Sequence, residues 1–178
     1  RDPEMSRGLG DVYKRQGNKF DAAIIRGVTM KYKILIGEKT AEQAKKEIAN
    51  VYNPTGDVKI TVKGRHLIKG LPESVEISDK DMYDFLHDSV MEIVDKIKEV
   101  FEQTPPELVG DILTNGIVLT GGGAMLKGFT DLVTEAVGAP CYVADDPIEC
   151  VAKGVAKAFD YTDDLLDGFE KISLYRYK

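Results

Sequence analysis

Three consecutive glycines, Gly121 to Gly123, limit how this chain can fold more than any other feature of its sequence. They follow an apolar strand predicted over residues 116–120 and precede a helix predicted over residues 124–137. Without Cβ atoms the backbone can turn tightly there, and a ligand can approach within contact distance. The unpaired N–H groups of a following helix favour an anionic or polar ligand. Close strand–helix packing is the alternative explanation, but three glycines in a row favour nucleotide binding.

Two common nucleotide motifs do not fit this turn completely. A Walker A loop requires G-x-x-x-x-G-K-[ST], and Lys127 is followed by a glycine rather than preceded by one. A dinucleotide fingerprint requires glycine at position 126, where this chain has Leu126. Asp145 nevertheless follows a predicted strand, where a ribose-binding acid would lie. A dinucleotide-binding oxidoreductase domain that uses the three glycines and Asp145 is therefore an alternative.

The hydrophobic periodicity predicts an α/β organisation, with short strand–helix units in the second half of the chain. Helices are expected over residues 19–32, 79–103, 107–113, 124–137 and 147–159, and one more opens at Thr40, where Gln43 completes a capping box. Strands are expected at residues 58–62, 66–68 and 74–77, as a small antiparallel sheet interrupted at Gly64, and at 116–120 and 140–144, as a parallel pair.

Composition excludes several classes of protein. The 178 residues carry 30 acidic and 24 basic side chains, and this balance argues against a nucleic-acid binder. No apolar run approaches the ~20 residues that cross a bilayer. Cys141 and Cys150 form no C-x-x-C pair and are typical of a reduced, cytoplasmic protein. His66 and His87 have no metal-ligand spacing.

The two ends of the chain are expected to lie outside the fold. Residues 1–16 have neither a helical nor a strand period, and we interpret them as a non-native leader. Residues 161–178 are acidic at first and then carry two tyrosines, which is typical of a surface tail.

The run from Ile117 to Gly128, I-V-L-T-G-G-G-A-M-L-K-G, resembles the adenosine motif of the actin, heat-shock chaperone and sugar kinase superfamily. In detail it resembles the MreB and Mbl family of bacterial actin-like cell-shape proteins. Four further stretches fit this family in the same order: Gly17–Asp21, Leu35–Glu42, Gly70–Pro72 and Asp146–Gly154.

The resemblance implies the C-terminal half of an actin-like ATPase fold. Residues 17–34 and 79–160 would form a parallel-type α/β core subdomain, and residues 35–78 a small inserted α+β subdomain. The family's two phosphate loops and first connecting helix do not occur in this sequence. The 178-residue chain by itself is therefore expected to lack the groups that organise Mg²⁺ and water, and to be inactive as an ATPase.

The resemblance also implies ATP as the cofactor, with Mg²⁺ in the intact protein. The contact residues would be Gly121, Gly122, Gly123 and Ala124 on one wall of the pocket, and Glu42, Gln43, Ala44 and Lys45 on the other. A Glu42 carboxylate can accept from ribose hydroxyls, and the Lys45 stem can pack along the purine edge. Spacing alone would favour a solvated Glu–Lys pair, and it is the resemblance that reverses this preference. Gly154 would allow close helix packing at the domain hinge.

Partners follow from the resemblance alone. It implies self-association into filaments, contact with the cell-wall elongation machinery and with the membrane surface, and no nucleic acid. The expected location is the cytoplasm, on the inner face of the membrane.

Overall fold

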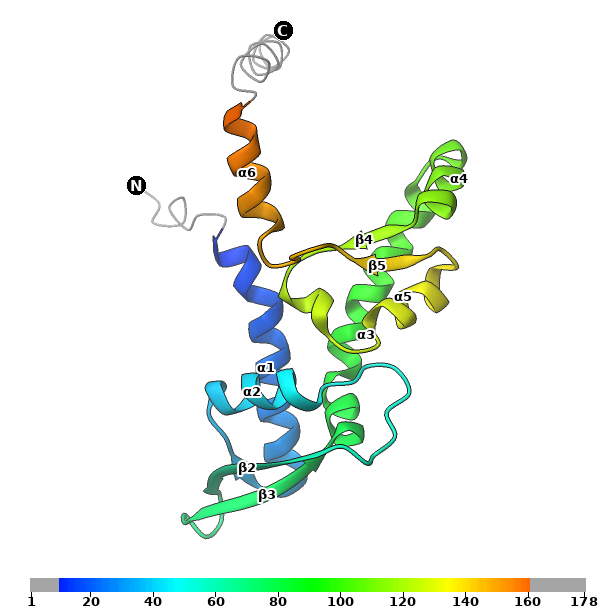
Figure 1. The fold of residues 1–178 in the computed structure, drawn as a ribbon. Helices are drawn as coiled ribbons and strands as arrows, with labels where there is room; N and C mark the ends of the chain where they lie inside the picture. Colours follow the sequence, from blue (N-terminus) through cyan, green and yellow to red (C-terminus); the bar gives the residue numbers. More distant parts are fainter. Residues whose placement is uncertain (1–9, 161–178) are drawn as a thin grey trace, which may run out of the picture.

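The computed structural model describes residues 10–160, in which helices and strands alternate along the chain (Figure 1). The helices are α1 (Gly10–Tyr32), α2 (Glu38–Ile48), α3 (Asp79–Gln103), α4 (Pro106–Asn115), the short 3₁₀ helix η2 (Gly122–Met125), α5 (Phe129–Val137) and α6 (Cys150–Asp160). The strands are β1 (Ile34–Leu35), β2 (Lys59–His66), β3 (Pro72–Ser78), β4 (Ile117–Leu119) and β5 (Cys141–Val143). The predicted tail over residues 161–178 lies outside the described residues.

The strands form two separate sheets. The first is antiparallel with the order β1-β2-β3, and Val62 of β2 lies opposite Val75 of β3. The second consists of β4 and β5, which run parallel with Val118 opposite Tyr142. The antiparallel pairing of the strands predicted at residues 58–62 and 74–77 and the parallel pair predicted at residues 116–120 and 140–144 are confirmed.

One hydrophobic core connects the predicted core subdomain with the predicted insertion. Phe20, Ile24 and Val28 recur every four residues and bury one face of α1. They pack in a cluster with side chains from α3, α2, the first sheet and α5, including Met82, Leu86, Val90, Ala44, Ile48, Val62, Ile77 and Val133. Burial of one such large side chain contributes about 1.5–3 kcal/mol. Residues 35–78 are therefore held by the same core as α1, α3 and α5.

Helix α3 matches its predicted range of residues 79–103 at both ends. Ser78 and Asp81 form a capping box at its start: the Ser78 hydroxyl accepts from the Asp81 N–H at 3.2 Å, and the Asp81 carboxylate accepts from the Ser78 N–H at 2.9 Å. Pro105 and Pro106 follow its end, where a proline cannot continue the hydrogen-bonding pattern. Local signals therefore determined this helix.

The capping box predicted at Thr40 is wrong. Helix α2 begins two residues earlier, at Glu38, and its N-cap is Gly37, which makes no side-chain cap bond. Thr40 lies inside the first turn, and the Gln43 amide instead donates to Glu47 at 2.8 Å along the exposed face. The helix extends because residues 38 and 39 do not oppose it and Ala41 and Ala44 are fully buried.

Two other boundaries differ from the prediction. Gly64 does not end a strand, because β2 continues through it to His66 and the predicted strand over residues 66–68 does not form. A Cβ on Gly64 would lie 2.4 Å from the carbonyl oxygen of Leu35, so glycine is what allows β1 to pair beside it. Helix α1 begins at Gly10, inside the segment excluded as a leader, because a helix propagates more easily than it nucleates.

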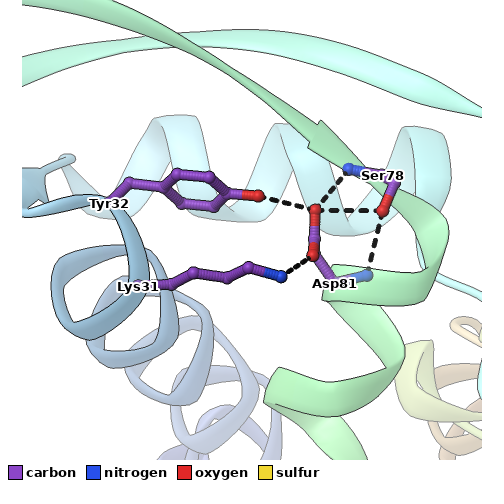
Figure 2. A network of polar contacts seen from close by, with 4 residues as sticks. All are labelled: Lys31, Tyr32, Ser78 and Asp81. Carbon is purple, nitrogen blue, oxygen red and sulfur yellow. Dashed lines mark hydrogen bonds and ion pairs between the residues drawn. The ribbon is translucent and has the colours of Figure 1, made fainter.

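A polar network joins the C-terminal end of α1 to the start of α3 (Figure 2). Asp81 is 8% exposed and lies at its centre. The Tyr32 hydroxyl donates to one carboxylate oxygen at 2.8 Å, the Lys31 ammonium pairs with the other, and Ser78 donates from its N–H and hydroxyl groups. Asp79, two residues before Asp81, is also buried, and its carboxylate accepts from the N–H groups of Thr55 and Gly56. These two bonds anchor the loop before β2.

The network holds Asp81 in its charged form. Burial acts to raise the pKa of Asp81, but the hydrogen bonds from Lys31, Ser78 and Tyr32 together outweigh it and lower the pKa to about 2. The bond to Asp81 raises the pKa of Lys31. Burial, followed by the bond to Asp81, raises the pKa of Tyr32. All three groups therefore keep their charge states and contacts from mildly acidic to alkaline pH.

We predict that this network makes the fold acid-sensitive over a defined range. The folded pKa of Asp81 lies below the unfolded value of about 3.9, so its contribution is complete above about pH 4 and is lost as the pH falls towards 2. The shift corresponds to about 2 kcal/mol. Urea unfolding between pH 2 and 6 should show Asp81→Asn less stable than wild type by about this amount at pH 6, with the difference shrinking below pH 4.

The exposed acid Asp95, also on α3, provides the matched control. Asp95→Asn should follow the wild-type curve within about 0.5 kcal/mol, as is usual for surface substitutions. A constant difference between Asp81→Asn and wild type across the pH range would contradict the assignment.

Candidate functional site

The two segments predicted to face a nucleotide both lie against the N-terminal half of α1. The Lys45 ammonium of α2 pairs with the Asp21 carboxylate at 2.8 Å, and both side chains are 14% exposed. A Cβ on Gly123 would lie 3.9 Å from the Phe20 ring. The neighbouring residues Phe20 and Asp21 therefore contact the glycine turn and helix α2 respectively, and α1 forms a common support under them.

Gly121 is required by the backbone conformation of the turn. Its φ is +83°, in the left-handed region that L side chains rarely adopt, and its N–H donates to the carbonyl of Pro147 at 2.7 Å. This bond ties the turn after β4 to the loop after β5. The turn is thus held by its connection to β4 and by its hydrogen bond to the loop after β5. Its shape is therefore set by the protein itself and does not require a ligand.

Gly122 and Gly123 differ from Gly121, because the space beside Gly122 is open and the space beside Gly123 is bordered only by Phe20. A Cβ on Gly122 would meet no atom within 4 Å, and a Cβ on Gly123 would only touch Phe20 at ordinary contact distance. Close strand–helix packing, the alternative explanation of the glycines, does not account for these two positions. The missing side chains instead leave backbone accessible to a ligand, and both residues are exposed.

The α-helix predicted to start directly after the glycines is wrong in its position. The 3₁₀ helix η2 covers Gly122–Met125, with Ala124 buried, and the α-helix α5 starts only at Phe129. Gly128 precedes it with φ +79°, and a Cβ there would lie 2.6 Å from the Tyr52 side chain. The sequence predicted that the free N–H groups of an α-helix start would lie beside the turn, but the structure places a 3₁₀ helix there instead.

Helix α2 presents only part of its predicted contact segment. The Glu42 carboxylate pairs with Lys46 at 2.7 Å, and this bond lowers the pKa of Glu42. Gln43 is exposed, whereas the methyl group of Ala44 is fully buried in the core and cannot contact a ligand. Glu42 and Gln43 are thus the exposed members of this segment, whereas the Lys45 side chain is only 14% exposed.

The lysine of the predicted segment is already neutralised. Besides Asp21, its ammonium lies 3.5 Å from the Gly17 carbonyl. With its charge satisfied, Lys45 offers its aliphatic stem more readily than its ammonium. This arrangement suits contact with an apolar ring edge better than binding of a phosphate.

The two walls are joined directly, which the sequence did not indicate. The Val51 N–H donates to the Lys127 carbonyl at 2.9 Å, and Asn50 and Lys127 form a parallel bridge. Asn50 is buried, and its side-chain oxygen accepts from the Tyr52 N–H at 3.2 Å. The end of α2 is therefore held at a fixed position relative to the glycine turn. Asn50 and Lys127 are 77 positions apart in sequence, so no local pattern could reveal this contact.

The segment after β5 borders the turn. Asp145 and Asp146 are both exposed, and Asp146 forms an ion pair with Lys153 of α6, which lowers the pKa of Asp146. A Cβ on Gly154 would meet nothing within 4 Å, so the close helix approach predicted there is not formed by the described residues. Within residues 10–160 no group of three or more His, Cys, Asp or Glu side chains could hold a metal ion.

Comparison with known proteins places this geometry in a family. The family described as MreB/Mbl protein matches residues 11–167. The cell shape-determining protein Mbl of Bacillus subtilis (strain 168) is 40% identical over 162 residues, which are 88% of this chain and 49% of that protein. The chain belongs to the MreB/Mbl family. It spans about half the length of the curated relatives that it matches.

Solved structures of MreB5 and MamK have the same fold as this chain. MreB5 of Spiroplasma citri bound to AMPPNP is similar with a TM-score of 0.79 and 32% identity, over 85% of this chain and 46% of that one. The MamK double helical filament has the same fold at a TM-score of 0.62 and 20% identity, over 74% of this chain and 40% of that one. The MreB/Mbl chain therefore has an actin-like α/β fold, and the dinucleotide-binding oxidoreductase alternative is not supported.

We predict that alanine substitution in this MreB/Mbl turn destabilises the fold at Gly121 but has little effect on stability at Gly122. Gly121→Ala should destabilise the fold by about 1–2 kcal/mol, because alanine is strained at positive φ. Gly122→Ala should change the free energy of unfolding by less than about 1 kcal/mol, because its Cβ meets no atom. Urea unfolding of both variants followed by circular dichroism tests this, and equal losses would contradict the assignment.

Proposed function

We propose that this chain provides the adenosine-binding part of an ATP-binding, filament-forming bacterial actin homologue that determines cell shape. The observation that carries the proposal is the open space beside Gly122 and Gly123, which packing does not explain. Support comes from MreB5 of Spiroplasma citri, which has been solved bound to AMPPNP and to ADP. The name of the Bacillus subtilis relative supports the role in cell shape.

In this proposal the adenosine lies between the two walls supported by α1. The backbone of Gly121–Gly123 and Ala124 would border the base and ribose on one side. On the other side, Glu42 would accept hydrogen bonds from ribose hydroxyls, Gln43 would offer an adaptable amide, and the Lys45 stem would line the purine edge. Ala44 would make no side-chain contact with the nucleotide. Its buried methyl group would instead hold α2 against the core and so position Gln43 and Lys45. No described residue is assigned to Mg²⁺.

We further propose that the intact protein assembles into filaments at the inner face of the membrane, in contact with the cell-wall elongation machinery. The MamK filament, which has the same fold, supports self-association. Within residues 10–160 no helix is long and apolar enough to cross a membrane. Contact with the membrane would therefore involve something other than a spanning helix of this part of the chain.

Nucleotide binding is the part of the proposal that substitution tests most directly. Gly122→Val should weaken binding of a fluorescent ATP analogue at least about tenfold, because valine fills the open space without disturbing packing. Gly110→Val is the matched control: its Cβ also meets no atom, but it lies on α4, away from both walls. The control should bind like wild type, and both variants should unfold at the wild-type urea midpoint.

Two outcomes would contradict the proposal. Equal affinities of Gly122→Val and wild type would show that the glycine turn is structural. A preference for NADH over ATP, lost in Asp145→Ala, would restore the dinucleotide alternative.

A further inference from the structure

The turn between β2 and β3 is held closed by the side chain of a histidine. His66 is the last residue of β2, and the turn that follows it leads into β3 (Figure 1). The His66 N–H donates to the Leu71 carbonyl at 3.0 Å, and the His66 carbonyl accepts from the Gly70 N–H at 2.8 Å. The Nδ1 atom of the His66 ring accepts from the N–H groups of Ile68 at 3.1 Å and Lys69 at 3.3 Å. One residue therefore fixes the ends of the turn through its backbone and the middle through its imidazole.

The imidazole has the position that an N-cap side chain takes at the start of a helix. A Ser, Thr, Asp or Asn at an N-cap likewise accepts from the N–H groups two and three residues further along the chain. A histidine can do so only while the accepting nitrogen carries no hydrogen, because a protonated ring nitrogen is a donor. The neutral His66 ring in this turn must therefore carry its hydrogen on Nε2.

Protonation of the ring would remove both of these bonds and add a positive charge to a basic turn. The charged residues of the turn and of the segments that flank it are Lys33, Lys63, Arg65, Lys69 and Glu73. Glu73 already pairs with Lys69 at 3.0 Å, and residues 58–72 contain no acidic residue. The added charge would thus meet mainly like charges, which favours release of the turn over a new ion pair.

We propose that the β2–β3 turn is a pH-sensitive switch, in which the neutral His66 ring holds the turn closed and protonation of the ring releases it. An ordinary histidine is protonated below about pH 6.5, so the turn should be closed at about pH 7.5 and open at about pH 5.5. Ile68 is 82% exposed and Leu67 48% exposed. The switch therefore decides whether these apolar side chains are held in a fixed arrangement or move freely. It involves neither the glycine turn nor α2, so it does not depend on the proposed nucleotide binding.

NMR of the 178-residue chain tests the switch, because the chain has only two histidines, His66 and His87. Long-range proton–nitrogen spectra should show the His66 ring with its hydrogen on Nε2 at about pH 7.5. As the pH falls to about 5.5, the amide signals of Ile68 and Lys69 should shift in step with the His66 ring signals. The heteronuclear NOE of residues 67–70 should decrease over the same range, since the turn loses two hydrogen bonds.

Three variants assign the response to the His66 ring. His66→Asn should keep the turn closed across the whole range, because its amide oxygen can accept from the same N–H groups and does not titrate. His66→Ala has no side-chain acceptor and should give an open turn even at about pH 7.5. His87→Gln is the matched control: His87 is exposed on α3, beside Asp88, and its removal should leave the wild-type response unchanged.

Trypsin digestion at a single pH gives a second readout, because the turn contains the cleavable bond after the exposed residue Lys69. His66→Ala should be cut there at least about tenfold faster than wild type, since two hydrogen bonds that close the turn are absent. His66→Asn should be cut at the wild-type rate. Circular dichroism melting should be unchanged in all variants, because the turn lies outside the hydrophobic core.

Several results would overturn the proposal. These are a neutral His66 ring with its hydrogen on Nδ1, amide signals of Ile68 and Lys69 that do not follow the His66 titration, or a His66→Asn variant that keeps the wild-type pH response. Loss of the response in His87→Gln would assign it to α3 instead. Equal trypsin cleavage of His66→Ala and wild type would show that the imidazole does not hold the turn.

Discussion

The packing of α1 against α3 is the interaction on which the rest of this structure depends. Ile24 and Val28 are fully buried and meet Leu86 and its neighbours in the central cluster. At one end of this pair, Lys31 and Tyr32 close a charged network around Asp81 (Figure 2). At the other end, Phe20 and Asp21 support the two walls of the candidate site. A shift of α1 would therefore disturb the insertion, the network and the site together.

The candidate site shows that adjacent glycines can serve unrelated purposes. Gly121 adopts positive φ where the chain leaves β4, whereas a Cβ on Gly122 would meet no atom and a Cβ on Gly123 would touch only Phe20. The open space beside Gly122 is the observation on which the proposed nucleotide site rests. Lys45 adds a second constraint, since its ammonium is paired with Asp21 and its side chain is only 14% exposed.

The overall charge of the chain conceals a strong asymmetry. A formal net charge of -6 argues against binding to nucleic acid, yet residues 63–71, at the tip of the β2–β3 hairpin, are basic and residues 99–113, around the start of α4, are acidic. Because α3 separates these regions by its whole length, opposite charges cannot neutralise each other within one copy.

Much of this fold could be predicted from the sequence because the signals are local. The four-residue apolar spacing determined α3 and the packed part of α1, prolines ended α3, and alternation located β2 and β3. The family motifs identified the chain, since the run from Ile117 to Gly128 is contiguous. The S-x-x-D pattern of the capping box at Ser78 is also present in the sequence, directly before the helix that it caps.

Tertiary structure decided what local signals could not. The start of α2 moved because burial of Ala41 and Ala44 outweighed the cap predicted at Thr40. The helix after the glycines shifted to Phe129 because Gly128 must pass close to Tyr52, a contact between distant segments. The pairing of Lys45 with Asp21 and the link from Val51 to Lys127 likewise join residues far apart in sequence. The sequence by itself determined which residues could form a nucleotide site, and only packing in three dimensions decided which of their atoms remain accessible.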